Sequence, residues 1–115
     1  MFRADLRSHP DLASAFDGVD ALVHLAAAMS GSESAMFSGT VTATERILGV
    51  MAQTPARRLV LASSFSVYDW SRIREVLDEN SPTEQVPYAT DGYAVSKVWQ
   101  ERVTRRLSQS NRVGI

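Results

Sequence analysis

The chain has 115 residues, of which 44% are hydrophobic and 22% charged, and its formal net charge is −1. This is the composition of one ordinary globular domain, and the near-neutral charge gives no reason to expect nucleic acid or an anionic membrane as a partner. The absence of cysteine excludes disulfides and thiolate metal sites, and His9 and His24 are too far apart to indicate a metal site. Because the N-terminus lacks the apolar core of a secretory signal, a cytoplasmic location is the default expectation.

Helix and strand patterns alternate along the chain. Residues 9–18, "HPDLASAFDG", predict a short helix with a proline near its start. Residues 20–27 and 57–64 are short continuous apolar runs, which are typical of buried parallel strands. Between these runs, apolar residues from 37 to 51 predict a helix of about four turns.

An irregular stretch follows residue 64 and leads to a last helix, predicted over 92–108. The final residues, "NRVGI", resemble the beginning of another strand. Strands that alternate with helices of this length indicate βαβ units and a parallel sheet. The sequence therefore predicts one α/β domain fragment over residues 1–115.

Lys97 is the only lysine, and the eleven other basic residues are arginines. It follows Tyr93 by four positions, so the two side chains lie on one side of a helix, one turn apart. An ammonium beside a phenol favours the phenolate and makes it a usable general acid–base. The pair alone is equally compatible with a solvated lysine beside a half-buried tyrosine. We expect it to lie off the face that packs on the sheet, which is predicted to be the apolar stripe Val95, Trp99, Val103 and Leu107.

Polar and small residues stand where both predicted strands end. Ser63 and Ser64 lie at the carboxyl edge, where open parallel sheets bind ligands, although serines also commonly terminate strands. No G-x-S-x-G elbow surrounds either serine, so neither is predicted to be a nucleophile. The alanines of "HLAAAM" permit a flat ligand or a helix to approach closely, and His24 is interpreted as a core histidine with a hydrogen-bond partner.

Taken in order, these segments resemble the extended short-chain dehydrogenase/reductase superfamily, and within it the NAD-dependent epimerase/dehydratase family. The resemblance runs from "ADLRSHPDLASAFDGVDALVHLAA" through "RRLVLASSFSVY" to "YAVSKVWQE". It implies a partial Rossmann-like, doubly wound parallel sheet, a nicotinamide cofactor (NAD or NADP), and a hydroxyl or carbonyl substrate of the nucleotide-sugar kind. A homodimer is a further expectation from the resemblance, whereas nucleic acid and membrane partners are not expected.

The resemblance also implies roles for individual residues. Tyr93 matches the catalytic tyrosine, Lys97 the lysine that favours its ionised form and holds the nicotinamide ribose, and Ser64 the residue that hydrogen-bonds the reacting oxygen. In such enzymes a hydride moves between substrate and nicotinamide while the tyrosine moves the proton. The implied cofactor contacts are Asp5, Leu6, Leu25, Ala26, Ala27, Tyr93 and Lys97.

The sequence departs from the family pattern in four places. The opening strand with its G-x-x-G-x-x-G turn is absent, the usual asparagine of the middle helix is Thr40, the usual glycine after "VY" is Asp69, and the C-terminal substrate lobe is expected to be missing. We therefore expect the fold to lack its first βαβ unit, to expose an edge of the strand at 20–27 and to be marginally stable. A non-catalytic remnant, an interaction module or a cofactor-sensing module of the same fold is the alternative to an enzyme.

Overall fold

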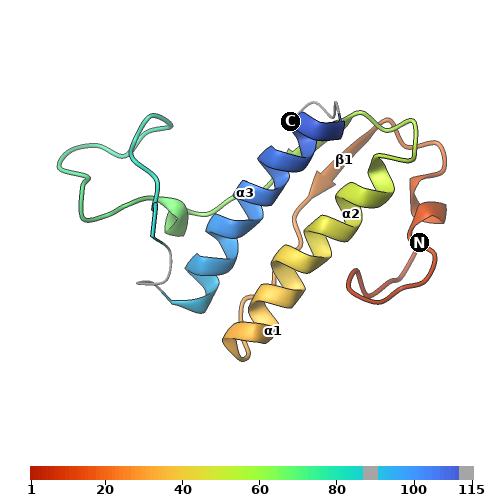
Figure 1. Ribbon diagram of the computed structural model, residues 1–115, viewed down its shortest axis with the longest axis horizontal. Helices are drawn as coiled ribbons and strands as arrows, with labels where there is room; N and C mark the ends of the chain where they lie inside the picture. Colours follow the sequence, from red (N-terminus) through yellow and green to blue (C-terminus); the bar gives the residue numbers. More distant parts are fainter. Residues whose placement is uncertain (87–90, 112–115) are drawn as a thin grey trace.

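The computed structural model describes residues 1–86 and 91–111, which form an α/β arrangement of two parallel strands with helices packed on one face (Figure 1). The predicted fold class is confirmed, and the end of the predicted last strand lies outside the described residues. In chain order the elements are η1 (Ala13–Phe16), β1 (Ala21–His24), α1 (Glu33–Phe37), η2 (Ser38–Thr42), α2 (Ala43–Met51), β2 (Arg58–Leu61), η3 (Phe65–Val67) and α3 (Gly92–Asn111).

Both predicted strands form, and they pair in parallel with Leu22 opposite Leu59. Leu59 joins Phe16, Leu48 and Met51 in the buried core on the α2 side of the sheet. Side chains on the other face point away from α2 because strand residues alternate in direction. The expectation that these strands are buried on both faces is therefore wrong, since Val23 and Val60, opposite each other in register, are 59% and 60% exposed.

The predicted first helix is only the short 3-10 turn η1. The Asp11 carboxylate accepts a hydrogen bond from the backbone N–H of Ser14, which favours a tight turn over a longer helix. Asp17 is already extended, and Gly18 follows with a φ of 71°. The short turn still buries Phe16 in the core.

The middle helix is longer than predicted, because α1, η2 and α2 follow one another without a break. Ser32 caps its start by accepting a hydrogen bond from Ala35 N–H. Its central segment, η2, is a π-helical turn that contains Gly39. A Cβ at Gly39 would lie 2.8 Å from the Cβ of Ala28, so this glycine lets the helix pass close to the segment that leaves β1.

The last helix, α3, runs three residues beyond its predicted end, and it packs beside α2 (Figure 1). The prediction that its apolar stripe forms the buried face is wrong, because Val95, Trp99, Val103 and Leu107 are only half-buried, although Leu107 packs against the core. The buried residues of α3 include the apolar Ala94 and Val98 but are mostly polar, namely Ser96, Lys97, Gln100, Thr104 and Ser108. Most of these side chains are small, so α3 approaches α2 closely.

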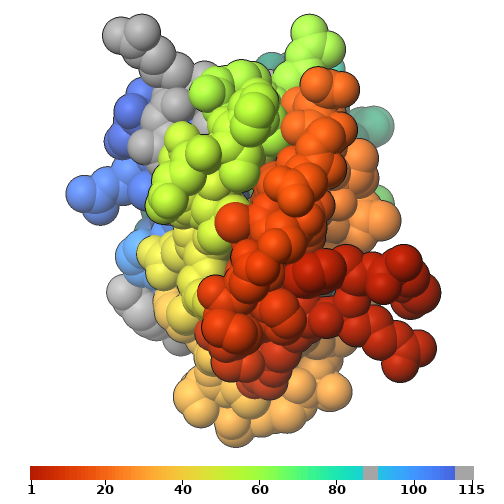
Figure 2. Space-filling model, turned by 90° about the vertical axis from the view of Figure 1, so that its right-hand side faces the viewer, coloured from red at the N-terminus to blue at the C-terminus, as the bar shows by residue number. Residues whose placement is uncertain are grey.

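The N-terminal segment lies against α2 and β1, as Figure 2 shows for the red and yellow-green surfaces. Arg46 of α2 holds it by donating to the backbone oxygens of Leu6 and His9, each at 2.8 Å. Residues 68–86 form an irregular loop that Arg102 of α3 binds through the carbonyl oxygens of Glu84 and Gln85. No helix in the described part of the chain has the length and apolarity that crossing a membrane requires.

Candidate active site

Lys97 is buried at the carboxyl edge of the sheet, with only 3% of its surface exposed. Its Nζ donates to the backbone oxygen of Ala62, directly after β2, at 2.7 Å, and to Oε1 of Gln100. An ammonium has three N–H donors, and two of them have acceptors among the described residues. The described residues offer the third donor no acceptor. The prediction that the Tyr93–Lys97 pair lies off the packed face is therefore wrong for Lys97.

The surroundings of Lys97 oppose its charge more than they support it. Burial lowers the pKa of Lys97 from its ordinary value of 10.5, and the carboxylate of Glu101 acts in the opposite direction. Both hydrogen-bond acceptors of the ammonium are neutral. The positive charge is thus held by dipoles rather than by an ion pair.

Tyr93 lies in the first turn of α3, one turn before Lys97, and is half-buried. Asp91 caps this end of the helix, since its Oδ1 accepts from Ala94 N–H at 2.9 Å. Gly92 allows the helix start to pack on α1, because a Cβ there would lie 3.3 Å from the Cα of Glu33. The predicted helical spacing of the tyrosine and lysine is confirmed, whereas the catalytic roles assigned to them stay predictions.

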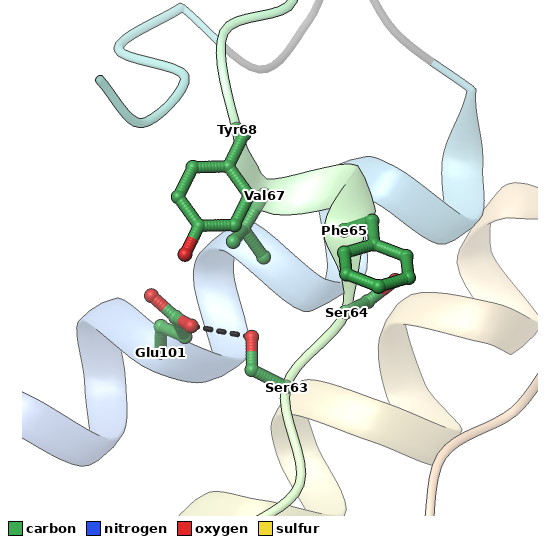
Figure 3. A pocket seen from close by; sticks show the side chains of 6 residues that line it. All are labelled: Ser63, Ser64, Phe65, Val67, Tyr68 and Glu101. Atoms are coloured by element: carbon green, nitrogen blue, oxygen red, sulfur yellow. Dashed lines mark hydrogen bonds between the residues drawn. The ribbon is translucent and has the colours of Figure 1, made fainter. Parts of the chain in front are cut away.

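Ser63 and Ser64 follow the end of β2, as predicted, and line an open hollow of about 460 Å³ with Phe65, Tyr68 and Glu101 (Figure 3). Ser64 caps η3 by accepting from Ser66 N–H at 3.2 Å. Ser63 donates to the carboxylate of Glu101 on α3. In Figure 3 the hydroxyl of Tyr68 and the carboxylate of Glu101 both point into the space between η3 and α3.

The segment that leaves β1 reaches the same edge. Leu25 and Ala26 are exposed there, and the carbonyl oxygen of Ala26 lies 3.4 Å from Nε2 of Gln100. Ala28 N–H donates to the Thr40 hydroxyl at 2.9 Å. Thr40, which stands where the family has an asparagine, thus fixes the segment after β1 to the middle helix. At Ala28 the small side chain serves close helix packing, as its contact with Gly39 indicates. Ala27 is half-buried.

Asp5 and Leu6 lie in the N-terminal segment, and no hydrogen bond in the described part of the chain links them to Lys97. Asp5 forms a two-pronged pair with Arg7, at 2.8 and 3.0 Å. These hydrogen bonds lower the pKa of Asp5 from 3.8 to about 2. The side chain of Leu6 packs against the core instead. The structure thus gathers Ala26, Ser64 and Lys97 at one edge and leaves Asp5 and Leu6 outside this group.

Sequence reasoning missed Gln100 and Thr44, two fully buried polar side chains behind Lys97. The Gln100 amide donates to the Thr44 hydroxyl at 2.9 Å, and His24 Nε2 lies 2.9 Å from the same oxygen. His24 is therefore the core histidine that was predicted. A signal for this cluster was present, because polar residues recur every four positions in α3 at Ser96, Gln100, Thr104 and Ser108.

Comparison with known proteins agrees with this geometry. The sequence model of the NAD-dependent epimerase/dehydratase family matches residues 1–115. The chain belongs to this family. Membership confirms the resemblance and the Rossmann-like fold that were predicted from the sequence, since the similar solved structures include Rossmann-fold epimerases and dehydratases.

Three relatives illustrate the family. UDP-glucose 4-epimerase 2 of Arabidopsis thaliana is 31% identical over 117 residues, which cover 95% of this chain and 32% of the plant protein. A short-chain dehydrogenase/reductase superfamily protein of Agrobacterium tumefaciens, solved with bound NAD, is 31% identical with a TM-score of 0.74, over 92% of this chain and 32% of that one. A dTDP-glucose 4,6-dehydratase of Streptomyces venezuelae, also solved with NAD, is 28% identical with a TM-score of 0.80, over 96% and 34%. This family member thus spans about a third of the length of these relatives.

Proposed function

We propose that the protein is an NAD-dependent enzyme of the epimerase, dehydratase or reductase type that acts on a nucleotide sugar. The observation that carries the proposal is the buried ammonium of Lys97, held at the carboxyl edge of the sheet one helical turn after Tyr93. A buried lysine without an ion-pair partner is costly, so it is retained where its charge has a use. The family membership supports the choice of cofactor.

The residues at this edge fit a nicotinamide cofactor. We assign the third N–H donor of Lys97 to a ribose hydroxyl, and the exposed residues Leu25 and Ala26, where the chain leaves β1, to the face of the cofactor. Ala27 adds no bulk beyond a methyl group. When bound, NAD supplies the hydride acceptor that no side chain of the protein provides.

The protein's own residues then divide the remaining work. Tyr93 moves the proton of the reacting hydroxyl or carbonyl group, and Ser64 hydrogen-bonds the same oxygen, because a hydroxyl both donates and accepts. The hollow beside Ser64, bounded by Phe65 and Tyr68, is the proposed place of the sugar. The UDP- and dTDP-sugar enzymes among the relatives support the proposal of a nucleotide-sugar substrate.

Tyr93→Phe tests the catalytic assignment. With NAD and UDP-glucose supplied, we expect the variant to lose turnover by at least about 100-fold, because general acid–base catalysis contributes this much. Its affinity for NAD stays within about twofold, since the ring remains in place. Turnover is measured by chromatography of the nucleotide sugars, and the affinity by calorimetry.

Two results would contradict the proposal. Near-normal turnover in Tyr93→Phe removes the tyrosine from the mechanism. Binding of NAD by the unmodified protein without turnover of UDP- or dTDP-glucose favours the alternative function, a cofactor-sensing module that uses the same edge.

A further inference from the structure

A buried polar cluster lies behind Lys97, between β1, α2 and α3. Its other members are His24, Thr44 and Gln100, and each of the four side chains is at most 4% exposed. Burying polar groups costs free energy unless they are hydrogen-bonded, so their partners define how each one is oriented. The proposed roles of Tyr93, Lys97 and Ser64 make no use of Gln100.

The hydrogen bonds fix the orientation of the Gln100 amide. Lys97 has only donors, so the amide oxygen must face it, and the amide nitrogen points the other way. That nitrogen donates to Thr44 Oγ1 at 2.9 Å and lies 3.4 Å from the carbonyl oxygen of Ala26. A flipped amide would place donor against donor at Lys97. The side chain is therefore locked at both ends.

Thr44 links the Gln100 amide by hydrogen bonds to the helix backbone and to β1. Its hydroxyl donates to the carbonyl oxygen of Thr40 at 2.6 Å, so Oγ1 serves as acceptor for its other neighbours. His24 Nε2, 2.9 Å away, must then carry its proton and donate to Thr44. Burial, and secondly the charge of Lys97, lower the pKa of His24, which keeps the ring neutral. The His24 and Gln100 nitrogens, 3.4 Å apart, are both donors and make no bond to each other.

We propose that Gln100 is a positioning residue for Lys97: its amide oxygen and the Ala62 carbonyl hold two N–H groups of the ammonium, so that the third is presented to the cofactor and to the side of Tyr93. This inference rests on the proposed function for the use of that third donor. An amide does not pass protons along, so Gln100 orients the ammonium rather than relaying protons from it.

The neutrality of the amide matters for this role. A carboxylate at position 100 would neutralise the ammonium and reduce its effect on a neighbouring phenol. Among the described residues, the charged or titratable groups around Lys97 are Tyr93 and Glu101 on its own helix and His24 on β1. Glu101 also accepts a hydrogen bond from Ser63, and His24 is neutral. Gln100 thus supplies an acceptor to Lys97 without supplying a charge.

The test uses the fact that Lys97 is the only lysine. Incorporation of lysine labelled with ¹³C at Cε gives one NMR signal, and its pH titration reports the pKa of Lys97 in the full chain without any cofactor. Gln100→Met removes the acceptor at similar length, and we expect it to lower this pKa by about one pH unit. Gln100→Glu places a carboxylate there and raises the pKa by about the same amount.

Gln53 provides the matched control, because it is an exposed glutamine in the turn after α2 whose amide bonds only to the backbone of that helix in the described structure. Gln53→Met and Gln53→Glu leave the Lys97 titration unchanged. Equal Lys97 pKa values in the unmodified chain and in Gln100→Glu overturn the proposal. If circular dichroism shows that Gln100→Met is unfolded, the two glutamate variants decide the question. The proposal then requires that the pKa of Lys97 rises in Gln100→Glu and does not rise in Gln53→Glu.

Titration of the same signal with NAD separates this proposal from the proposed function. We expect Gln100→Met to weaken NAD binding about tenfold, while the Gln53 variants bind as the unmodified chain does. A pKa response to Gln100 substitution without NAD binding supports the positioning role and contradicts the proposed function. If NAD binds but the pKa of Lys97 is the same in the Gln100 variants as in the unmodified chain, the proposed function is supported and the positioning role is overturned.

Discussion

The buried ammonium of Lys97 explains why a single lysine stands among arginines. The site offers two acceptors to it, the carbonyl oxygen of Ala62 and the amide oxygen of Gln100. A guanidinium carries five N–H donors in a planar fork, so an arginine here would leave several donors unpaired in a buried place. The compact ammonium needs fewer partners and keeps one donor for a ligand.

His24 makes the stability of the protein depend on pH. Its pKa in the folded chain lies below the ordinary 6.5, because burial and the charge of Lys97 disfavour the protonated ring. Between these two pKa values the unfolded chain binds more protons, so the free energy of unfolding rises with pH in that window. We therefore expect stability to fall as the pH is lowered from about 7 to about 5, measured by urea unfolding at fixed ionic strength.

Two histidine variants separate this effect from general acid sensitivity. His24→Asn has no titrating ring, so its stability changes less between these pH values, whereas His9→Asn retains the full dependence. The contribution of Asp5 to the pH dependence of stability falls in a separate range. Its pKa is lowered from 3.8 to about 2 in the folded chain, so the stability that it contributes is lost only as the pH falls below about 4. An identical pH dependence in His24→Asn and the unmodified chain would refute the assignment.

At the level of elements, α3 shows where sequence periodicity misleads. Trp99 belongs to an apolar stripe, but Arg102 stacks 5.2 Å from the centre of its ring and holds the loop at Glu84. Trp99 thus lies on the loop side of the helix, Leu107 packs against the core, and a polar face is buried against α2. A buried polar face is stable only when partners from other elements meet it, and these partners are not visible in the sequence of one helix.

Substitution by alanine at two glycines of the middle helix is expected to change the stability of the protein in opposite directions. In Gly39→Ala the new Cβ would lie 2.8 Å from the Cβ of Ala28, so the helix must move away, at a cost of about 1–3 kcal/mol. In Gly49→Ala the Cβ meets nothing within 4 Å, and the substitution stabilises the helix by about 0.5–1 kcal/mol. Urea unfolding of both variants at neutral pH measures the difference. Equal effects of the two substitutions would contradict the close packing of η2 on the segment after β1.

For the whole molecule, the order of strands and helices and the carboxyl edge were predictable. Continuous apolar runs identified β1 and β2, and the serines after Leu61 marked the end of the second strand. The open face of the sheet was not predictable, because Val23 and Val60 are as apolar as their buried neighbours. The cluster behind Lys97 was also missed, since it joins residues from β1, α2 and α3 that are distant in sequence.

A single titration shows whether this edge of the sheet binds NAD through Lys97. NAD is added to the chain labelled with ¹³C at Cε of its single lysine, and the one lysine signal is followed. We expect the signal to move and to saturate at millimolar NAD or below, because the third N–H donor of the ammonium acquires an acceptor. A signal that stays in place throughout the titration would contradict it.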